Sequence, residues 1–199
     1  MRKKQGCDAA SAAPLHVLML PGLDGTGSMS TPLLSALQAH GLTTQAIALP
    51  AQGGQDYATL ARWLWPQLPR HPFILLAESF SGPLAVELAA RQPAALRGLV
   101  LAATFARRPE PLPAAGAALL SPAWPVPPVA LLARLLLGRW RTGEHMSMLR
   151  AALAQVPATT LRQRAAATLR VDVRALLHRS GCRRCACRRV MTGCCGHRA

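Results

Sequence analysis

The N-terminal half of the chain alternates short apolar runs with stretches of helical spacing, and this alternation constrains the fold more than any other feature. The runs with strand character are 15–20, 43–49, 73–77 and 96–102, and the helical stretches between them are 30–40, 57–68 and 82–91. Apolar strands separated by helices are typical of a parallel sheet that is covered on both faces. The sequence therefore predicts an α/β fold, and 199 residues are enough for one domain with a sizeable core.

The character of the chain changes after Arg107. Seven prolines lie within 109–128, and helical stretches follow at 129–137, 145–154 and 159–177. The Leu-rich stretch 129–137 is shorter than the roughly 20 apolar residues that a membrane span needs, and it carries Arg134. We interpret it as an apolar helix packed over a pocket, and no membrane span is predicted.

Positive charge is concentrated near the C-terminal end of the sequence. The chain carries 23 Lys and Arg against 8 Asp and Glu, a net charge of +15, and six of its Arg residues lie within 179–199, where no acid occurs. The body of the chain is therefore only moderately basic, and nucleic acid is not predicted as a partner. The sequence carries no indication of an oligomeric state.

The first residues and the cysteines favour a reducing compartment. Met1–Cys7 is charged but leads into residues rich in Ala and Ser, so no secretion signal is predicted and residues 1–14 are expected to be disordered. Cys7 stands alone, whereas the other five cysteines lie within 182–195. A body without paired cysteines suits the cytoplasm, which is the predicted location.

The candidate catalytic residues are concentrated where the third strand meets the next helix. The run Ala77–Gly82 (AESFSG) joins the two within a few residues and matches a relaxed G-x-S-x-G pattern, with Ala77 and Ser81 in the glycine positions. Such a turn lifts the Ser79 hydroxyl above the carboxyl edge of the sheet, and the N–H groups of the helix start stabilise negative charge there. Glu78 is interpreted as a spacer in the turn. For Ser79, this pattern alone leaves open the alternative of an ordinary N-cap serine.

A glycine-rich loop after the first strand favours a nucleophilic Ser79 over an ordinary N-cap serine. Leu20–Gly27 (LPGLDGTG), together with Ala77–Ala85 (AESFSGPLA) and Leu96–Ala103 (LRGLVLAA), resembles the N-terminal two-thirds of an α/β-hydrolase of the carboxylesterase type (AB hydrolase-1 type). The resemblance covers about 15–177. Pro21 stands where many members of the family have His, and Asp24 is interpreted as a residue that caps the loop.

The resemblance implies both the architecture and the chemistry. It implies a parallel sheet with helices on both faces and a helical cap at about 107–170. It implies Ser79 as the nucleophile, and the backbone N–H groups of Leu23 and Phe80 as an oxyanion hole for small acyl esters. No cofactor and no metal are implied.

Two members of the expected catalytic triad are missing from their places. The family order is Ser, then Asp or Glu, then His, with the acid after a strand that follows the cap. Asp172 is the last acid of the chain, and only His178 and His197 follow it. His178 precedes the place of the missing strand, and His197 lies in an Arg- and Cys-rich tail with no orienting carboxylate. We therefore expect an incomplete triad, with the last strands and helices of the fold missing.

The segment 178–199 is rich in Arg and Cys and permits three interpretations. Cys182, Cys185 and Cys187, followed by two further cysteines and His197, offer soft ligands for zinc, but they lack a matching second C-x-x-C pair. A solvated basic tail is the second interpretation. The third, which we favour, is a shift of reading frame near 177–181 that replaced the part of the enzyme with the acid and the histidine.

Codon arithmetic supports the frame shift. Met191-Thr192 is encoded ATG-ACN, and the frame that starts at the third base of the Gly181 codon reads GAC there, a codon for Asp. The same frame reads Leu across Cys194-Cys195. Its translation has the form h-P-x-L…x-x-D-x-L-L, which resembles a hydrolase strand that ends in the triad acid.

Two consequences are expected. The strand at 96–102 borders the sheet with unpaired backbone groups, because a disordered tail of low strand propensity cannot pair with it.

Two function classes also stay open. The chain is either an ester hydrolase by descent, with doubtful activity, or a non-catalytic remnant or basic binding protein with a Cys-rich tail.

Overall fold

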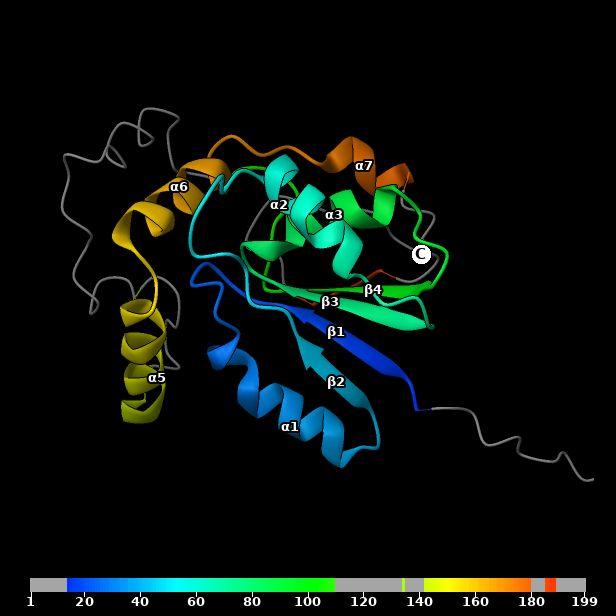
Figure 1. Cartoon of the computed structure of the whole chain (residues 1–199), viewed down its shortest axis with the longest axis horizontal. Coiled ribbons are helices and arrows are strands. Elements are labelled where there is room, and N and C mark those ends of the chain that lie inside the picture. Colours follow the sequence, from blue (N-terminus) through cyan, green and yellow to red (C-terminus); the bar gives the residue numbers. More distant parts are fainter. Residues whose placement is uncertain (1–13, 110–133, 135–141, 180–184, 189–199) are drawn as a thin grey trace, which may run out of the picture.

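A parallel sheet forms the centre of the structure (Figure 1). The computed structural model describes residues 14–109, 134, 142–179 and 185–188. Within them the strand order is β2-β1-β3-β4-β5, and every neighbouring pair is parallel. The strands are β1 (His16–Leu20), β2 (Thr43–Ala46), β3 (Phe73–Glu78), β4 (Leu96–Ala102) and β5 (Cys185–Arg188). The predicted α/β class and the four predicted strands are confirmed.

Helices cover both faces of this sheet (Figure 1). One face carries α1 (Thr31–Ala39), which packs against β2, and the other carries α2 (Tyr57–Leu64), α3 (Ser81–Ala90) and α7 (Arg174–Arg179). Two more helices, α5 (Gly143–Ala154) and α6 (Ala158–Thr168), lie beyond the carboxyl ends of the strands. Short 3-10 turns η1 (Ser28–Ser30) and η2 (Trp65–Gln67) flank α1 and α2.

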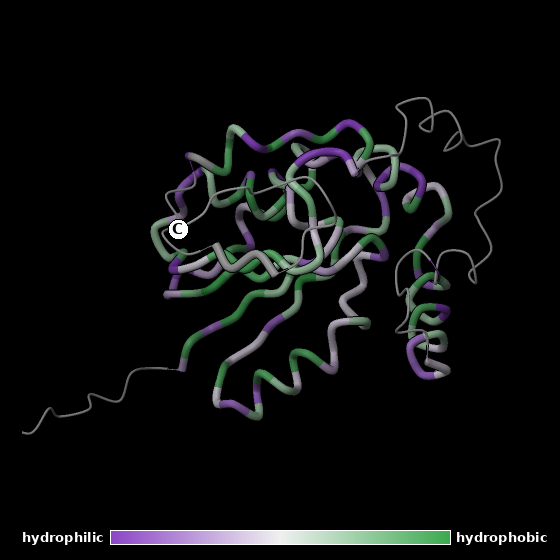
Figure 2. The backbone as a smooth tube through the Cα atoms, turned by 180° about the vertical axis from the view of Figure 1, so that it is seen from behind, coloured by the Kyte–Doolittle hydropathy of each residue, from purple (hydrophilic) through white to green (hydrophobic). Residues whose placement is uncertain are grey.

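The strand β1 separates two apolar cores. Leu18 and Leu20 point into the larger core with α2 and α3, whereas Val17 and Met19 point to the opposite face, toward Leu34 of α1. Side chains alternate in this way because successive residues of a strand face opposite sides of the sheet. Hydrophobic stretches accordingly gather in the sheet and its covering helices, as Figure 2 shows.

Local signals explain where the helices begin and end. The Asp56 carboxylate accepts the N–H of Thr59 (2.9 Å) and caps α2. The predicted helix at 57–68 is α2 followed by the 3-10 turn η2, since Pro66 cannot continue the α-helical bonding. Gly41, with φ of 78°, follows the end of α1.

The prediction of one helix over 159–177 is wrong. The chain leaves the helical conformation between α6 and α7, where Asp172 forms an antiparallel bridge with Arg107. The N–H of Val173 donates to Ala106 O (2.7 Å), and Val171 O accepts from the N–H of Arg108 (3.0 Å). Val171 and Val173 are buried and the residue between them is exposed, so this stretch has the period of a strand. The predicted helix at 129–137 lies outside the described residues, apart from Arg134.

The sheet has a fifth strand that the sequence did not predict. Cys185–Arg188 pairs in parallel with β4, with Leu99 opposite Cys185 and Ala102 opposite Arg188. The expectation that β4 borders the sheet is therefore wrong. An unpaired strand edge is a template for any extended segment, and such pairing outweighs a weak intrinsic preference. Residues 1–13, 180–184 and 189–199 lie outside the described part of the chain.

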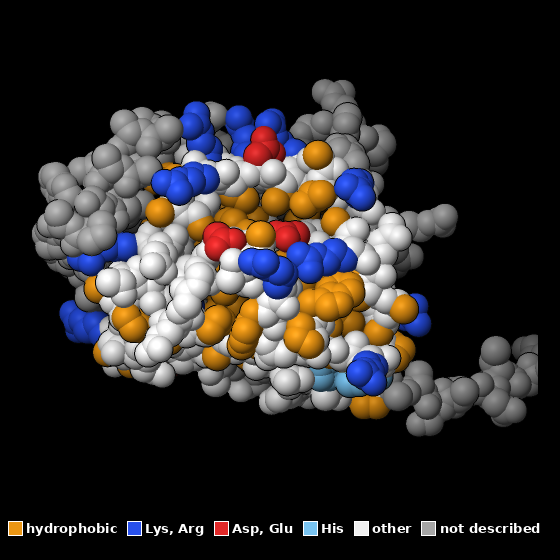
Figure 3. All heavy atoms as spheres, turned by 45° about the horizontal axis from the view of Figure 1, so that its top comes forward, with side chains coloured by type: hydrophobic (Ala, Val, Ile, Leu, Met, Phe, Trp, Pro, Cys, Tyr) orange, Lys and Arg blue, Asp and Glu red, His pale blue; other side chains and the backbone are white. Residues whose placement is uncertain are grey.

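The outer face of α2, α3 and α7 is mixed in character. Charged side chains of both signs lie among apolar ones on this face (Figure 3). Arg91 lies over the ring of Trp65, 5.7 Å from its centroid, and binds the carboxylate of Glu87 (2.9 Å). Among the helices that are described, none is both long and apolar enough to cross a membrane.

A buried histidine begins β1. His16 is 9% exposed, and its Nε2 has no hydrogen-bond partner among the described residues. Its ring meets that of His71 edge to face, with the centroids 4.8 Å apart. Burial, and secondarily the neighbouring His71, lower the pKa of His16 below its usual value.

We predict that His16 makes the stability depend on pH. The unfolded chain takes up a proton at this position at higher pH than the folded chain, so the free energy of unfolding falls as the pH drops below about 6.5. Urea unfolding of the parent, His16→Leu and the exposed-site control His40→Gln at several pH values measures this. The loss toward pH 5 should shrink in His16→Leu only, and equal pH dependence in all three would contradict the prediction.

Candidate active site

The turn between β3 and α3 holds Ser79 in a conformation that few residues adopt. The φ angle of Ser79 is +49°, in the left-handed region. Its backbone is held on both sides: the N–H donates to Ala102 O (3.0 Å), and the carbonyl accepts the N–H of Gly82 (3.1 Å) and the hydroxyl of Thr104. Backbone strain of this kind persists only where the surroundings enforce it, and it concentrates at functional sites.

Gly82 lets the turn close against the end of β4. A methyl group on Gly82 would lie 1.8 Å from Oγ1 of Thr104 and 2.6 Å from its Cβ, distances that no side chain tolerates. Thr104 is buried, and its hydroxyl is bound to the carbonyl of Ser79. The glycine at position 82, one residue beyond the predicted pattern, is therefore needed for close approach.

Ser81 does more than fit a position where glycine is usual. Its side chain is fully buried, and its hydroxyl donates to the carbonyl of Pro21. This bond joins the start of α3 to the loop after β1. The assignment of Ser81 to a glycine position of the pattern missed this role, because the contact joins positions far apart in sequence.

The loop after β1 reaches Ser79. A methyl group on Gly22 would lie 3.9 Å from Ser79 Cβ. The N–H of Gly25 donates to Gly22 O (3.0 Å), which closes a tight turn, and Gly25 has φ of 71°. The Asp24 carboxylate accepts the N–H (2.9 Å) and the hydroxyl (2.5 Å) of Thr26, in agreement with its interpretation as a loop cap.

The two N–H groups proposed as an oxyanion hole have no competing partner. Within the described part of the chain, no hydrogen bond runs from the N–H of Leu23 or of Phe80 to another residue. Phe80 is buried, and its ring stacks on Tyr57 with the centroids 5.0 Å apart, which holds its backbone in place. Neither N–H is therefore occupied by another group of the described residues.

Glu78 lies on the other side of the turn. Its carboxylate accepts the hydroxyl of Ser30 (3.3 Å). Burial raises the pKa of Glu78, the bond from Ser30 lowers it, and the charge of Asp24 raises it again. A half-buried carboxyl that binds η1 fits the interpretation of Glu78 as a spacer rather than a catalytic acid.

The triad partners of Ser79 are not found in the described residues. No hydrogen bond there joins the Ser79 hydroxyl to a histidine or a carboxylate. Asp172 is exposed and is bound by Arg174 (2.6 Å), a contact that lowers the pKa of Asp172 to about 2. The side chain of His178 and the whole of His197 lie outside the described part, as do most of the cysteines proposed as zinc ligands.

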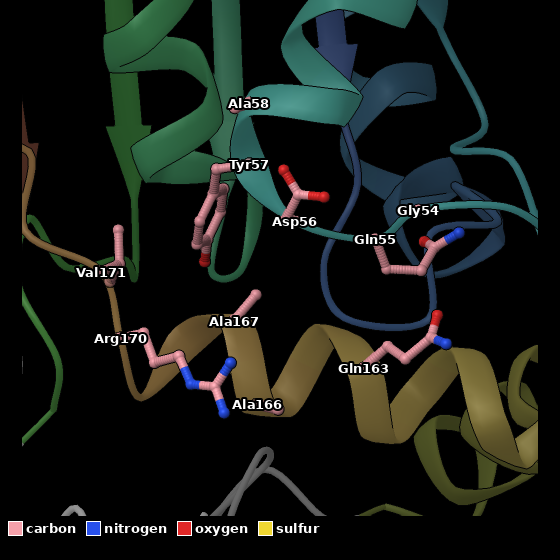
Figure 4. Close-up of a pocket in the computed structure, with 10 residues that line it drawn as sticks. All are labelled: Gly54, Gln55, Asp56, Tyr57, Ala58, Gln163, Ala166, Ala167, Arg170 and Val171. Atoms are coloured by element: carbon pink, nitrogen blue, oxygen red, sulfur yellow. The ribbon is translucent and has the colours of Figure 1, made fainter.

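A groove lies next to the site, between the start of α2 and α6. It has a volume of about 480 Å³, and Figure 4 shows Tyr57 pointing across it toward α6. Gln55 and Asp56 line one wall, and Arg170 and Gln163 lie on the other. The groove borders the ring that supports Phe80.

The sequence reasoning missed the contacts of three residues of the site, although Ser81 lies within the predicted pattern. Thr104 binds the carbonyl of Ser79, Ser81 binds Pro21, and Arg164 of α6 binds the carbonyls of Leu23 and Asp24. Each acts through a contact between segments that are distant in the chain. No local pattern marks them.

Comparison with known proteins identifies the fold. No protein-family model matches this sequence, and no curated protein is significantly similar to it. Among solved structures, a carboxylesterase from Nitrososphaera gargenis matches with a TM-score of 0.65 at 14% identity, over 85% of this chain and 70% of that one. A hydrolase from Pseudomonas aeruginosa matches with a TM-score of 0.64 at 22% identity, over 83% and 68%.

A third structure, the enol-lactonase from Burkholderia xenovorans, has a TM-score of 0.65 at 19% identity, over 85% of this chain and 70% of that one. The parallel sheet, the strained turn at Ser79 and these similarities define the class. The chain has the α/β-hydrolase fold.

We predict that Gly82→Ala destabilises the fold by several kcal/mol, beyond the roughly 1–3 kcal/mol of ordinary overpacking, because the backbone cannot retreat from Thr104. Gly143→Ala is the matched control, since no atom lies within 4 Å of the added methyl group. Urea unfolding compares the two with the parent. The double variant Gly82→Ala/Thr104→Ala should recover part of the loss, and a Gly82→Ala variant as stable as the control would refute the close-contact argument.

Proposed function

We propose that this chain is a carboxylic ester hydrolase scaffold in which Ser79 is the nucleophile. The N–H groups of Leu23 and Phe80 receive the oxyanion, and the substrate is a small acyl ester. The observation that carries the proposal is the positive φ of Ser79 in a turn that the loop Gly22–Gly25 touches. A carboxylesterase and an enol-lactonase among the similar structures support this reaction class.

The chemistry follows from these groups. The Ser79 oxygen bonds to the carbonyl carbon and gives up its proton to water, and the negative charge that forms on the carbonyl oxygen is stabilised by the two N–H groups. The bond to the alcohol then breaks. Water attacks the acyl-enzyme, the acid leaves, and a proton returns to the Ser79 oxygen.

The missing base limits the rate. Among the described residues no histidine binds the Ser79 hydroxyl, and without such a base the serine is a weak nucleophile and an ordinary alcohol leaves without a proton donor. An ester of p-nitrophenol avoids the second difficulty, because p-nitrophenolate leaves as an anion. Such esters are therefore the appropriate probes for this chain.

We predict slow turnover of p-nitrophenyl butyrate, at most about 10³-fold above the reaction in water, because binding and the oxyanion hole act without a base. Release of p-nitrophenolate by the full chain and by Ser79→Ala measures it, and Ser30→Ala serves as a nearby serine control. A fluorophosphonate should label the parent and Ser30→Ala at position 79, and leave Ser79→Ala unlabelled.

The outcomes separate the two function classes. Turnover equal in the parent and in Ser79→Ala would refute the proposal and leave a non-catalytic protein or a basic binding module. Rapid turnover, typical of complete enzymes and lost in Ser79→Ala, would show that a base is present outside the described residues.

We further infer that the acid and the histidine belong to the alternative reading frame. The strand β5 pairs with β4 at 185–188, and the GAC codon of the alternative frame spans Met191-Thr192, shortly after that strand. An acid that follows the strand beside β4 is the arrangement that the family resemblance implies.

A test restores that frame with one nucleotide inserted near the codon of Leu177 and continues translation to the next stop. We predict a soluble protein with turnover at least about 10³-fold above that of the 199-residue chain, since a complete triad adds an activated nucleophile. Ser79→Ala in the same protein is the control. An extended protein that folds but is no more active than the 199-residue chain would contradict the frame-shift inference.

A further inference from the structure

Arg164 of α6 is a fully buried side chain that binds only oxygen atoms of other segments. It is 0% exposed. Nη1 donates to the carbonyls of Leu23 (2.9 Å) and Asp24 (2.7 Å), Nη2 donates to Pro50 O (3.1 Å), and Nε donates to the side-chain oxygen of Gln55 (2.8 Å). A planar guanidinium with donors on several sides can bridge oxygens in this way, whereas a lysine ammonium cannot.

These oxygens belong to two loops at the carboxyl edge of the sheet. One is the loop after β1 that reaches Ser79, and the other follows β2. Gln55 is 2% exposed and donates to the carbonyls of Pro50, Gln52 and Gly53, so the oxygen that it presents to Arg164 is fixed. The loops are also joined directly, since the N–H of Leu49 donates to Gly25 O (2.7 Å).

The fit around the guanidinium is tight. A methyl group on Gly25 would lie 2.2 Å from Nη1 of Arg164. Gly25 thus provides both the positive φ of the turn and the space for the guanidinium. A side chain at position 25 would therefore overlap the guanidinium.

The helix α6 is fastened to the body by polar groups. Thr160, one helical turn before Arg164, is buried and donates to Ala51 O (2.6 Å). Thr160 therefore reaches only the loop after β2, while Arg164 reaches that loop and the loop beside Ser79. This difference provides a matched pair of positions on one helix.

We propose that Arg164 is a positioning residue for the oxyanion hole: it holds the Leu23 and Asp24 carbonyls so that the Leu23 N–H stays directed at the Ser79 site. The inference rests on the proposed function. The turn Gly22–Gly25 is closed by one backbone bond at the Gly22 carbonyl, whose peptide group carries the Leu23 N–H, and Arg164 binds the carbonyls of the next two peptide groups. A preorganised donor stabilises the transition state because it does not reorient during the reaction.

The position of Arg164 on α6 has a consequence for the cap. The oxyanion hole has its full shape only while α6 lies against the two loops. A change that lifts α6 releases the Leu23 and Asp24 carbonyls together with it. Turnover and docking of α6 are therefore coupled through one side chain.

The experiment compares Arg164→Ala, Arg164→Lys and Thr160→Val with the full-length parent. Release of p-nitrophenolate from p-nitrophenyl butyrate gives kcat and KM, and hydrogen–deuterium exchange reports on the segment 22–27. We expect both Arg164 variants to lose about 10- to 100-fold in kcat with KM little changed, and to exchange faster in 22–27. Thr160→Val also loses a buried bond of α6 but should keep the kcat of the parent.

Chemical rescue adds a readout that a purely structural role does not move. Ethylguanidinium at millimolar concentration should restore kcat in Arg164→Ala, while ethylammonium should not. If the Arg164 variants do not fold, Gln55→Met tests the same argument, since it removes one acceptor of the guanidinium and should raise exchange in 22–27.

The outcomes distinguish the inference from the function on which it rests. Loss of kcat equal in Thr160→Val and Arg164→Ala, or unchanged exchange in 22–27 in the Arg164 and Gln55 variants, would overturn the role of Arg164. Turnover unaffected by Ser79→Ala would refute the proposed function, while the exchange of 22–27 would still show whether Arg164 holds the loop.

Discussion

The close approach of α3 to the end of β4 is the constraint on which the rest of the site depends. Gly82 lies against Thr104 with no room for a side chain, and this contact sets the direction in which α3 leaves the sheet. A left-handed φ at a serine costs about 1–3 kcal/mol. It is held there because the Ser79 N–H donates to Ala102 O and the Ser79 carbonyl accepts from Thr104 and Gly82. Because α3 is almost wholly buried, the strained turn cannot relax by moving the helix.

Loops at the carboxyl edge of a parallel sheet have no strand neighbours, so other groups must define their shape. Here the loop after β1 is held at three points, by Ser81 at Pro21, by Leu49 at Gly25, and by Arg164 at Leu23 and Asp24. All three contacts use backbone carbonyls as acceptors. The N–H of Leu23 is left without a hydrogen-bond partner among the described residues, as the proposed oxyanion hole requires.

The edge of the sheet shows how strongly backbone pairing acts on a segment of poor strand propensity. The segment Cys185–Arg188 pairs with β4, although Arg and Cys dominate its surroundings in the sequence. A free strand edge offers a full row of donors and acceptors, and parallel pairing satisfies them without any demand on side-chain identity. The position beside β4 is thus occupied even by a segment with no apolar pattern.

The sequence by itself determined the α/β class, the first four strands and the turn at Ser79, because apolar periodicity and a small-residue pattern are local properties. It did not determine that 159–177 breaks into two helices. The break arises because the backbone of 106–108 forms hydrogen bonds with the backbone of Val171 and Val173. The roles of Ser81, Thr104 and Arg164 were decided only by the tertiary structure. Each depends on a carbonyl group that folding brings within hydrogen-bond distance, and the spacing of residues along the sequence does not specify that distance.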